Sequence, residues 1–346
     1  MHKRNKIAIL LILILGSISV WFVFHTDKST LRKGLRNFAL EDTSRVTKLF
    51  LADKNAHTIT LVKMKPGEWK LNDKYYARND AVITLLGTMK SMDVKYPVAK
   101  MGQERIFRML ATMGTKVEAY EGDKLVKLFY VGTETPDFLG TYMLLADPET
   151  GKNSTVPYVV YIPGFDGYLT PRFLTGEDDW RDRTIFRFIP PEIKSIQVEF
   201  PEKAQDGFEI TNLPGTKFEV RSLKEKLAFE HIDTMAVMQY VSYFQNIQFE
   251  LIEKVSKNYR DSVVSSNPMC IIRLIDLKGN LNSVKLFYRN PPPGAIDSKG
   301  NPSKYDPDRI FALINNGKDF VTAQFYVFGK LIQPAAYFTS KNIVKR

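Results

Sequence analysis

The chain has 346 residues, of which 44% are hydrophobic, 12% aromatic and 25% charged, and its formal net charge is +11. This composition is typical of a folded protein with room for two or three domains. The excess positive charge lies in residues 1–6, 25–36 and 341–346, which leaves a net charge of +2 for residues 37–340. A nearly neutral body excludes the electrostatic footprint of a polyanion groove, so we expect no nucleic-acid partner.

The first predicted element is a transmembrane anchor over residues 7–24, IAILLILILGSISVWFVF, which carry no charge. A helix of this length spans roughly 27 Å, close to the hydrocarbon core of about 30 Å. Trp21 and Phe24 lie at its far end, where an aromatic belt is expected. A cleaved signal peptide is the alternative, but the apolar run continues past Ser17 and Ser19 without an A-x-A pattern.

The orientation of this anchor follows from energetics rather than from counting charges. Three basic residues precede the segment and four follow it closely, so the positive-inside rule does not decide. Moving the basic tail outward opposes a potential of about 2.3 kcal/mol per charge per 100 mV. We therefore expect a bacterial inner-membrane protein with residues 1–6 in the cytoplasm, a juxtamembrane linker over 25–44 and a periplasmic body.

The body begins with a predicted module over residues 45–173. Short alternating strands are expected near 45–52, 57–63, 68–71, 94–99, 115–120, 124–131, 141–146 and 157–162. Asn79 suits the N-cap of a helix striped by Val82, Leu85, Leu86 and Met89. A second helix carries Ile106, Met109, Leu110 and Met113 on one face. The pattern predicts an antiparallel sheet with helices, an α+β module.

A second copy of this module is predicted over residues 193–338. LVKLFYVG at 125–132 recurs as SVKLFYRN at 283–290, which pairs Phe129 with Phe287. The flanks agree in order. The other expected pairs are Val46, Leu49 and Leu51 with Ile193, Ile196 and Val198; Trp69 and Leu71 with Phe218 and Val220; 94–98 with 247–251; 151–152 with 317–318; and strand 157–163 with strand 324–329.

The second module also contains a predicted helix near 230–245. Its stripe of Ile232, Met235, Met238 and Val241 is interpreted as core packing against the sheet, with a methionine-rich binding face as the alternative. A connector over 174–192 joins the modules, and a basic tail over 339–346 ends the chain. The predicted fold class is therefore α+β, with an N-terminal transmembrane helix followed by two tandem copies of an antiparallel-sheet-plus-helices module.

The connector carries the first candidate site. Asp178, Asp179, Trp180, Arg181, Asp182 and Arg183 follow one another directly. Paired carboxylates beside arginines are suited to an acid–base or cation site. A salt-bridged joint in which Trp180 is a buried anchor is the interpretation that we favour.

The second candidate site is the loop 290–309, NPPPGAIDSKGNPSKYDPDR. Loops of this length inside a compact domain are usually functional or disordered. Pro291, Pro292 and Pro293 stiffen it, and Tyr305 offers an aromatic anchor for a partner. Asp297, Asn301 and Asp306 suggest calcium, but their spacing does not match an EF-hand loop.

The sequence carries no familiar catalytic, metal-binding or cofactor-binding motif. The histidines form no HExxH or i, i+4 metal pair, and the single cysteine, Cys270, lies in an apolar run where a buried core residue is expected. No phosphate-loop, dinucleotide or nucleophile-elbow motif occurs. We therefore expect no catalytic residue, metal or cofactor, although a triad assembled from distant positions would leave no such motif.

Several stretches of the body together resemble one protein family. These are ADKNAHTITLVKM, WKLNDKYYARNDAVITLLGTMKSMDVKYPV, GTYMLLAD, VPYVVYIPGFDGYLTPRF and DDWRDRTIF. They are similar to the family catalogued as domain of unknown function 4340, in its stand-alone, membrane-anchored bacterial form. The resemblance covers residues 45–338 and is densest before residue 190. It implies an envelope location and no active site, and some relatives accompany accessory subunits of gliding- or export-type ABC transporters.

Two functional hypotheses follow. The first is a non-enzymatic, membrane-tethered subunit or scaffold of an envelope assembly, accessory to an ABC-type export or gliding-type system, with envelope proteins as partners. The second is an envelope enzyme or ligand-binding protein that uses a cleft between the two modules near Trp180. Co-purification with membrane proteins favours the first hypothesis, and a concave cleft with clustered ionisable groups favours the second.

Overall fold

The computed structural model describes residues 37–215, 217–297 and 299–339. The predicted tail 1–6, membrane segment 7–24 and linker up to residue 36 lie outside the described residues, as does the basic tail from residue 340. Within the described ranges, no helix combines the length and apolarity needed to cross a membrane. The chain divides into two compact units, Met1–Asp182 (unit 1) and Arg183–Arg346 (unit 2).

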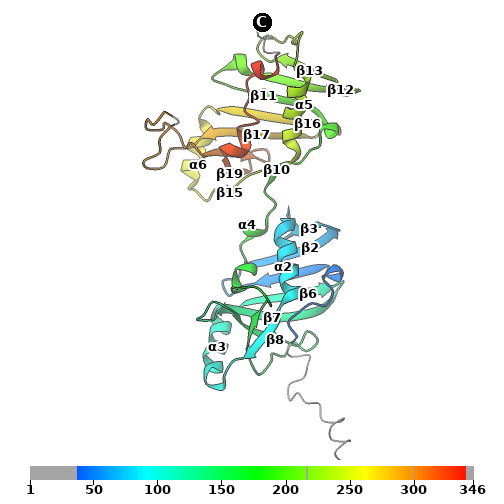
Figure 1. Cartoon of the computed structure of the whole chain (residues 1–346), viewed down its shortest axis with the longest axis vertical. Helices are drawn as coiled ribbons and strands as arrows, with labels where there is room; N and C mark the ends of the chain where they lie inside the picture. Colours follow the sequence, from blue (N-terminus) through cyan, green and yellow to red (C-terminus); the bar gives the residue numbers. More distant parts are fainter. Residues whose placement is uncertain (1–36, 216, 298, 340–346) are drawn as a thin grey trace, which may run out of the picture. The chain divides into compact units, whose positions relative to one another are not determined.

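Unit 1 is built on a nine-stranded antiparallel sheet in the order β4-β3-β2-β1-β6-β7-β8-β9-β5 (Figure 1). Its strands alternate buried and more exposed residues, as in β1, where Leu49 and Leu51 are buried. The strands are β1 (Lys48–Ala52), β2 (Thr58–Lys65), β3 (Glu68–Leu71), β4 (Tyr75–Tyr76), β5 (Asp93–Pro97), β6 (Thr115–Glu121), β7 (Lys124–Glu134), β8 (Thr141–Ala146) and β9 (Tyr158–Tyr161).

Two helices cover opposite faces of this sheet. Helix α2 (Asn79–Ser91) buries Val82, Leu85 and Met89 in the main core of unit 1. Helix α3 (Lys100–Met113) packs Ile106 and Leu110 on the other face, against side chains of β8 and β9. Two details of the sequence prediction are corrected. Asn79 is the first helical residue, after an N-cap at Arg78, and Met113 is exposed because the buried face of α3 is narrower than its stripe.

Unit 2 contains an eight-stranded antiparallel sheet in the order β13-β12-β11-β16-β17-β18-β19-β15 and a small sheet of two strands. The large sheet contains β11 (Ile193–Glu199), β12 (Phe208–Leu213), β13 (Lys217–Ser222), β15 (Leu251–Ile252), β16 (Cys270–Asp276), β17 (Leu281–Tyr288), β18 (Arg309–Ile314) and β19 (Asp319–Gln324). The small sheet pairs β10 (Thr184–Phe186) with β14 (Ile247–Gln248). The predicted α+β class with large antiparallel sheets is confirmed.

Helices again lie on both faces of the large sheet of unit 2. Helix α5 (Thr234–Ser242) buries Val237, Tyr240 and Val241 in the main core. Helix α6 (Lys257–Ser265) covers the other face, where Val263 packs on a cluster that includes Phe287 and Phe311. Asp233 caps α5, since its carboxylate accepts a 3.0 Å hydrogen bond from the Ala236 N–H.

The methionine stripe of α5 does not pack in the core as predicted. Met235 and Met238 have exposed fractions of 74% and 45%. The helix begins at Thr234 rather than near residue 230, and its inner face is set by Val237 and Tyr240. The tyrosine fixes this face, because its hydroxyl donates a 2.8 Å hydrogen bond to the Leu331 carbonyl inside the core.

Both large sheets follow one strand order. Reading from one edge, β3-β2-β1-β6-β7-β8-β9-β5 of unit 1 matches β13-β12-β11-β16-β17-β18-β19-β15 of unit 2, and β4 is additional. The strand registers make Leu49 of β1 equivalent to Ile196 of β11. Each residue is paired with the strand on either side of it, β2 and β6 for Leu49 and β12 and β16 for Ile196, at matching positions. They likewise equate Leu71 with Val220.

The shared VKLFY sequence is the exception, and the predicted pairing of Phe129 with Phe287 is wrong by three residues. Val117 in β6 is paired with Phe129, whereas its counterpart Ile272 in β16 is paired with Val284. Phe129 therefore corresponds to Val284 and faces the core beneath α2. Phe287 lies further along β17 on the opposite face, beneath α6. Successive residues of a strand face opposite sides, so an odd shift reverses every side chain.

Two predicted strand correspondences also need correction. Residues 324–329 are not a strand, because β19 ends at Gln324 and Phe325–Phe328 form the short helix α7. Residues 247–251 are divided between two sheets, since β14 pairs with β10 and β15 pairs with β19. The short β15 corresponds in sheet order to β5.

Candidate functional site

The acidic segment of the predicted connector closes unit 1. Helix α4 (Glu177–Trp180) contains Asp178 and Asp179 and ends at Trp180, whose side chain is buried in the main core of that unit. The indole Nε1 donates a 2.8 Å hydrogen bond to the Leu174 carbonyl. The Trp180 carbonyl accepts one of 2.7 Å from the Arg78 N–H. Trp180 is thus surrounded by its own unit.

The two residues that follow continue this closure. Arg181 is buried, forms an isolated bridge with Ala77 and places its guanidinium 3.9 Å above the Tyr75 ring. The Asp182 N–H donates a 2.8 Å hydrogen bond to the Tyr76 carbonyl. Residues 181–182 therefore lie along β4 as a further edge of unit 1.

Arg183 belongs to unit 2. Its guanidinium donates a 2.8 Å hydrogen bond to the Glu250 carbonyl, and its own carbonyl accepts one from the Phe249 N–H. The six consecutive candidate residues thus divide between the two units. Trp180 and Arg181 are held by contacts that stabilise an edge and a core, and the predicted acid–base interpretation gains no geometric support from them.

The loop 290–309 projects from unit 2 as an irregular hairpin (Figure 1). An isolated bridge joins Ile296 to Pro302, and the Asp297 carboxylate accepts hydrogen bonds from the Lys299 and Asn301 N–H groups. These bonds hold the turn and occupy the carboxylate that had suggested calcium. Among the described residues, no group of three or more His, Cys, Asp or Glu side chains is arranged to hold a metal.

The candidate residues of this loop differ in accessibility. Pro292 and Pro293 are exposed and Pro291 is half-buried. Tyr305 stacks on Tyr288, with ring centroids 3.8 Å apart and an interplanar angle of 11°. One face of the predicted aromatic anchor is therefore already covered.

An ionic network missed by the sequence analysis fixes the base of this loop. Arg289 lies between Glu253, at 3.8 Å, and the buried Asp306, at 3.7 Å. The fully buried Thr322 hydroxyl donates to Glu253 and accepts from Arg289. The carboxylates lie in loops beside β15 and β18, so only the fold brings them together. We interpret the network as the attachment of the loop.

A polar trio in unit 1 resembles a catalytic triad in composition but not in connectivity. The Asp53 carboxylate is 2.8 Å from His57 Nδ1 and accepts a 2.8 Å hydrogen bond from the Thr175 hydroxyl. In a triad the histidine bridges nucleophile and acid, whereas here the carboxylate is central. Partial burial raises the pKa of Asp53, but the hydrogen bonds from His57 and Thr175 outweigh it and lower this pKa to about 2.

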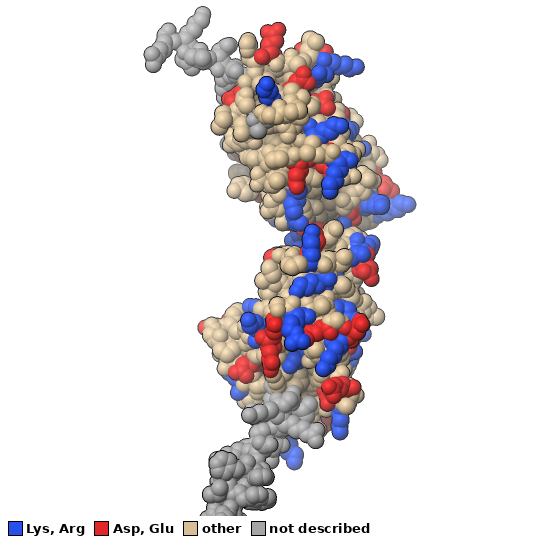
Figure 2. All heavy atoms as spheres, turned by 90° about the vertical axis from the view of Figure 1, so that its right-hand side faces the viewer, with Lys and Arg blue, Asp and Glu red and all other residues tan. Residues whose placement is uncertain are grey.

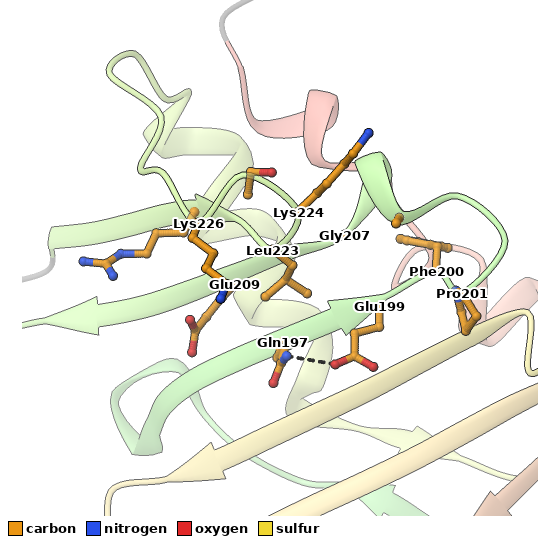
Figure 3. Close-up of a pocket in the computed structure, with 12 residues that line it drawn as sticks. Gln197, Glu199, Phe200, Pro201, Gly207, Glu209, Leu223, Lys224 and Lys226 are labelled. Carbon is orange, nitrogen blue, oxygen red and sulfur yellow. Dashed lines mark hydrogen bonds between the residues drawn. The ribbon is translucent and has the colours of Figure 1, made fainter.

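A concave site lies in unit 2, a pocket of about 650 Å³ at the ends of β11, β12 and β13 (Figure 3). Its volume is in the range of small-molecule sites. Gln197, Glu199 and Glu209 project from neighbouring strands to the same side (Figure 3). The wall is formed by residues after β11, by the last residue of β13 and by residues after β13: Phe200, Pro201, Ala204, Gly207, Ser222, Leu223, Lys224 and Lys226.

The pocket floor is a row of cross-strand neighbours. Gln197 is paired with Glu209, which is paired in turn with Arg221. The residue that precedes each member on its strand, Ile196, Phe208 or Val220, lies in the core beneath α5. Because successive residues of a strand face opposite sides, this row lies on the other face of the sheet. No motif in the sequence could reveal it, because its members are separated along the chain and meet only through strand register.

These observations define the chain as a pair of antiparallel α+β units of one topology, with a pocket in the second. A family model described as Domain of unknown function (DUF4340) matches residues 69–260, from β3 of unit 1 to α6 of unit 2. This is more than half of the chain, which therefore belongs to that family. No curated protein and no solved structure matches it.

Proposed function

We propose that this protein is a non-enzymatic, membrane-tethered subunit of a bacterial envelope assembly, accessory to an ABC-type export or gliding-type system. The observation that carries the proposal is the uncharged segment 7–24, placed directly before two units of one topology. A uniform apolar run of this length is typical of a membrane-spanning helix. The resemblance implies that some relatives accompany accessory subunits of ABC transporters, and this supports the kind of assembly that we propose.

The two units are further proposed to be duplicated copies of one module. Eight strands follow the same order in each sheet, and the glycine turns before Trp69 and Phe218 both carry a positive φ, 76° at Gly67 and 78° at Gly215. A tandem pair presents two related surfaces on one tether, which suits a scaffold. Loop 290–309 of unit 2 corresponds to the shorter connection 133–141 of unit 1. Its extra residues provide an added surface in one copy only.

The electrostatic surface supports a protein partner. On the face shown in Figure 2, Lys and Arg lie among Asp and Glu over both units. Mixed charge of this kind suits polar protein interfaces better than a polyanion. The proposed location is the inner membrane, with the N-terminus in the cytoplasm and the two units in the periplasm.

The direct test is affinity purification of the full chain from detergent extracts, followed by mass spectrometry. We expect stoichiometric co-purification of other membrane proteins, with a chain carrying only residues 1–44 fused to an unrelated periplasmic domain as the matched control. Recovery of the same proteins with both baits, or of none with the full chain, would contradict the proposal.

A second candidate function, ligand binding, is favoured by the pocket at β11–β13 rather than by the position first predicted. Trp180 is only 4% exposed, so it does not offer a surface for a ligand. The pocket in unit 2 carries charged groups of both signs and an apolar wall within one cavity.

A further inference from the structure

The pocket in unit 2 contains charged side chains that form no close ion pair within the protein. Two of its charged residues are paired within the protein, because Arg221 contacts Glu219 at 2.8 Å and Glu199 contacts Arg273 at 2.5 Å. Among the described residues, Glu209, Lys224 and Lys226 line the same pocket and form no close ion pair, although, after the hydrogen bond to Glu219, the charge of Glu209 helps to raise the pKa of its cross-strand neighbour Arg221.

The charges of the pocket are arranged by sign. The carboxylates Glu199 and Glu209 belong to β11 and β12, the inner strands. The cations Arg221, Lys224 and Lys226 belong to the edge strand β13 and the turn after it, and Lys224 extends away from the strands (Figure 3). The two signs of charge therefore come from different strands of the sheet.

The pocket also has an apolar wall. Leu223 is held in place because its N–H donates a 3.1 Å hydrogen bond to the Gly207 carbonyl. A Cβ at Gly207 would lie 3.3 Å from the Leu223 side chain, so glycine permits this close approach. Phe200 and Pro201 extend the wall from the other side. An apolar group bound here would gain burial against three side chains.

A comparison between the two units indicates that the fold does not require the charged and apolar residues of this pocket. Registers equate Glu209 with Thr60 and Arg221 with Asn72, so unit 1 carries uncharged residues at the same sheet positions. Unit 1 also joins its two strands by residues 53–57, whereas unit 2 uses the longer 200–207, which supplies the Phe200 wall. The charged row and its wall are features of unit 2.

We propose that this pocket binds a short peptide with a free C-terminal carboxylate, an apolar side chain and a free amino group. The carboxylate lies toward Lys224 and Lys226, the amino group toward Glu209, and the apolar side chain against Leu223 and Phe200. Each charged end of the peptide then forms a charge-assisted hydrogen bond, and its apolar side chain packs against the wall of the pocket. This ligand class goes beyond a scaffolding role and does not depend on it.

The test uses the full chain in detergent and isothermal titration calorimetry with three probes: the dipeptide Ala-Leu, its C-terminal amide and its N-acetyl form. We expect the free dipeptide to bind, and each blocked form to bind about tenfold more weakly, because each loses one charge-assisted contact. Equal binding of the dipeptide and its amide, or no heat from any probe at millimolar concentration, would overturn the proposal.

Variants locate the binding within the pocket. The double change Lys224→Ala with Lys226→Ala should weaken Ala-Leu about tenfold and abolish its preference over the amide, while Glu209→Gln should abolish its preference over the N-acetyl form. The matched control, Lys278→Ala with Lys299→Ala, removes two exposed lysines elsewhere in unit 2. Unchanged affinity in the pocket variants with native melting curves, or equal losses in the control, would place binding elsewhere.

Discussion

Trp180 donates its indole N–H to the carbonyl of Leu174, six residues earlier, across a distance of 2.8 Å. This bond and the burial of the indole fold the end of unit 1 back onto its core. The acidic residues around Trp180 are therefore held next to a structural anchor.

Replacing this anchor should destabilise unit 1. Truncation of a large buried aromatic residue to alanine typically costs about 3–5 kcal/mol, so Trp180→Ala should markedly lower the melting temperature measured by circular dichroism. Tyr76→Ala, at an exposed ring on the neighbouring strand β4, is the control and should change it little. A native melting curve for Trp180→Ala together with lost partner binding would instead assign the indole a functional role.

The proposed topology predicts a pattern of protease accessibility. Protease added to spheroplasts should digest residues 37–346 and spare a reporter fused to the N-terminus, because the bilayer would separate them. Immunoblotting of both ends measures the outcome, with detergent-lysed cells as the control in which both are digested. Protection of the body in intact spheroplasts would reverse the orientation, and a mature N-terminus near residue 20 would show a cleaved signal.

Loop 290–309 should contribute to partner binding without supporting the fold. Its attachment through Arg289, Asp306 and the Tyr288–Tyr305 stack lies outside residues 291–304. Replacing 291–304 by a short Gly/Ser linker should therefore keep the melting temperature and reduce the yield of co-purified partners. A stiff, proline-rich loop loses little entropy on docking. The same replacement at the turn 277–280 is the control, and wild-type yield after the loop replacement would remove it from the interface.

Asp53 should make unit 1 sensitive to acid. The pKa of its carboxyl is lowered from 3.8 in the unfolded chain to about 2 in the folded one. Its hydrogen bonds therefore stabilise the fold fully above pH 4 and are lost as the pH falls toward 2. Asp53→Asn should flatten the dependence of the melting temperature on pH in this window, and Asp73→Asn, at a side chain 89% exposed, should not. An unchanged slope in Asp53→Asn would assign the acid sensitivity to other groups.

Cys270 should report the folding of unit 2. Its thiol is buried in the core, and burial raises its pKa well above the ordinary value. Because the thiolate is the reactive form, iodoacetamide should modify the native chain far more slowly than the chain in denaturant, as followed by intact mass. Since the chain has one cysteine, any labelling reports this site. Rapid native labelling would show that β16 opens readily.

Much of the fold of unit 1 could be predicted from alternation of apolar residues. The range of β8, 141–146, is the same in sequence and structure, and the stripe of Val82, Leu85 and Met89 gave the buried face of α2. Such patterns are local, and each element buries one face. Leu49 and Ile196 were also paired correctly by the periodic flanks.

The rest depended on relations between strands. The five identical residues VKLFY led to the prediction that Phe129 is equivalent to Phe287. The hydrogen-bonded register of the strands, however, determines which residues lie on the same face. The pocket could not be predicted for the same reason, since Gln197, Glu209 and Arg221 meet only through register. Met235 and Met238 were misplaced because a stripe shows that a helix has an apolar face without showing which side the sheet covers.

The strand order has a consequence for how each sheet can form. Strand β5 precedes β6 in the chain but occupies the far edge of its sheet, where, among the described residues, it pairs with β9 alone. Residues 93–97 therefore cannot take their place in the sheet before residues 158–161 are available, and in unit 2 the same holds for β15 and β19. Because pairing of strands far apart in sequence costs more loop-closure entropy, we expect closure of this edge to be a late step in the folding of each unit. Lys95 and Pro97 in β5 are residues that discourage the waiting strand from pairing with another molecule.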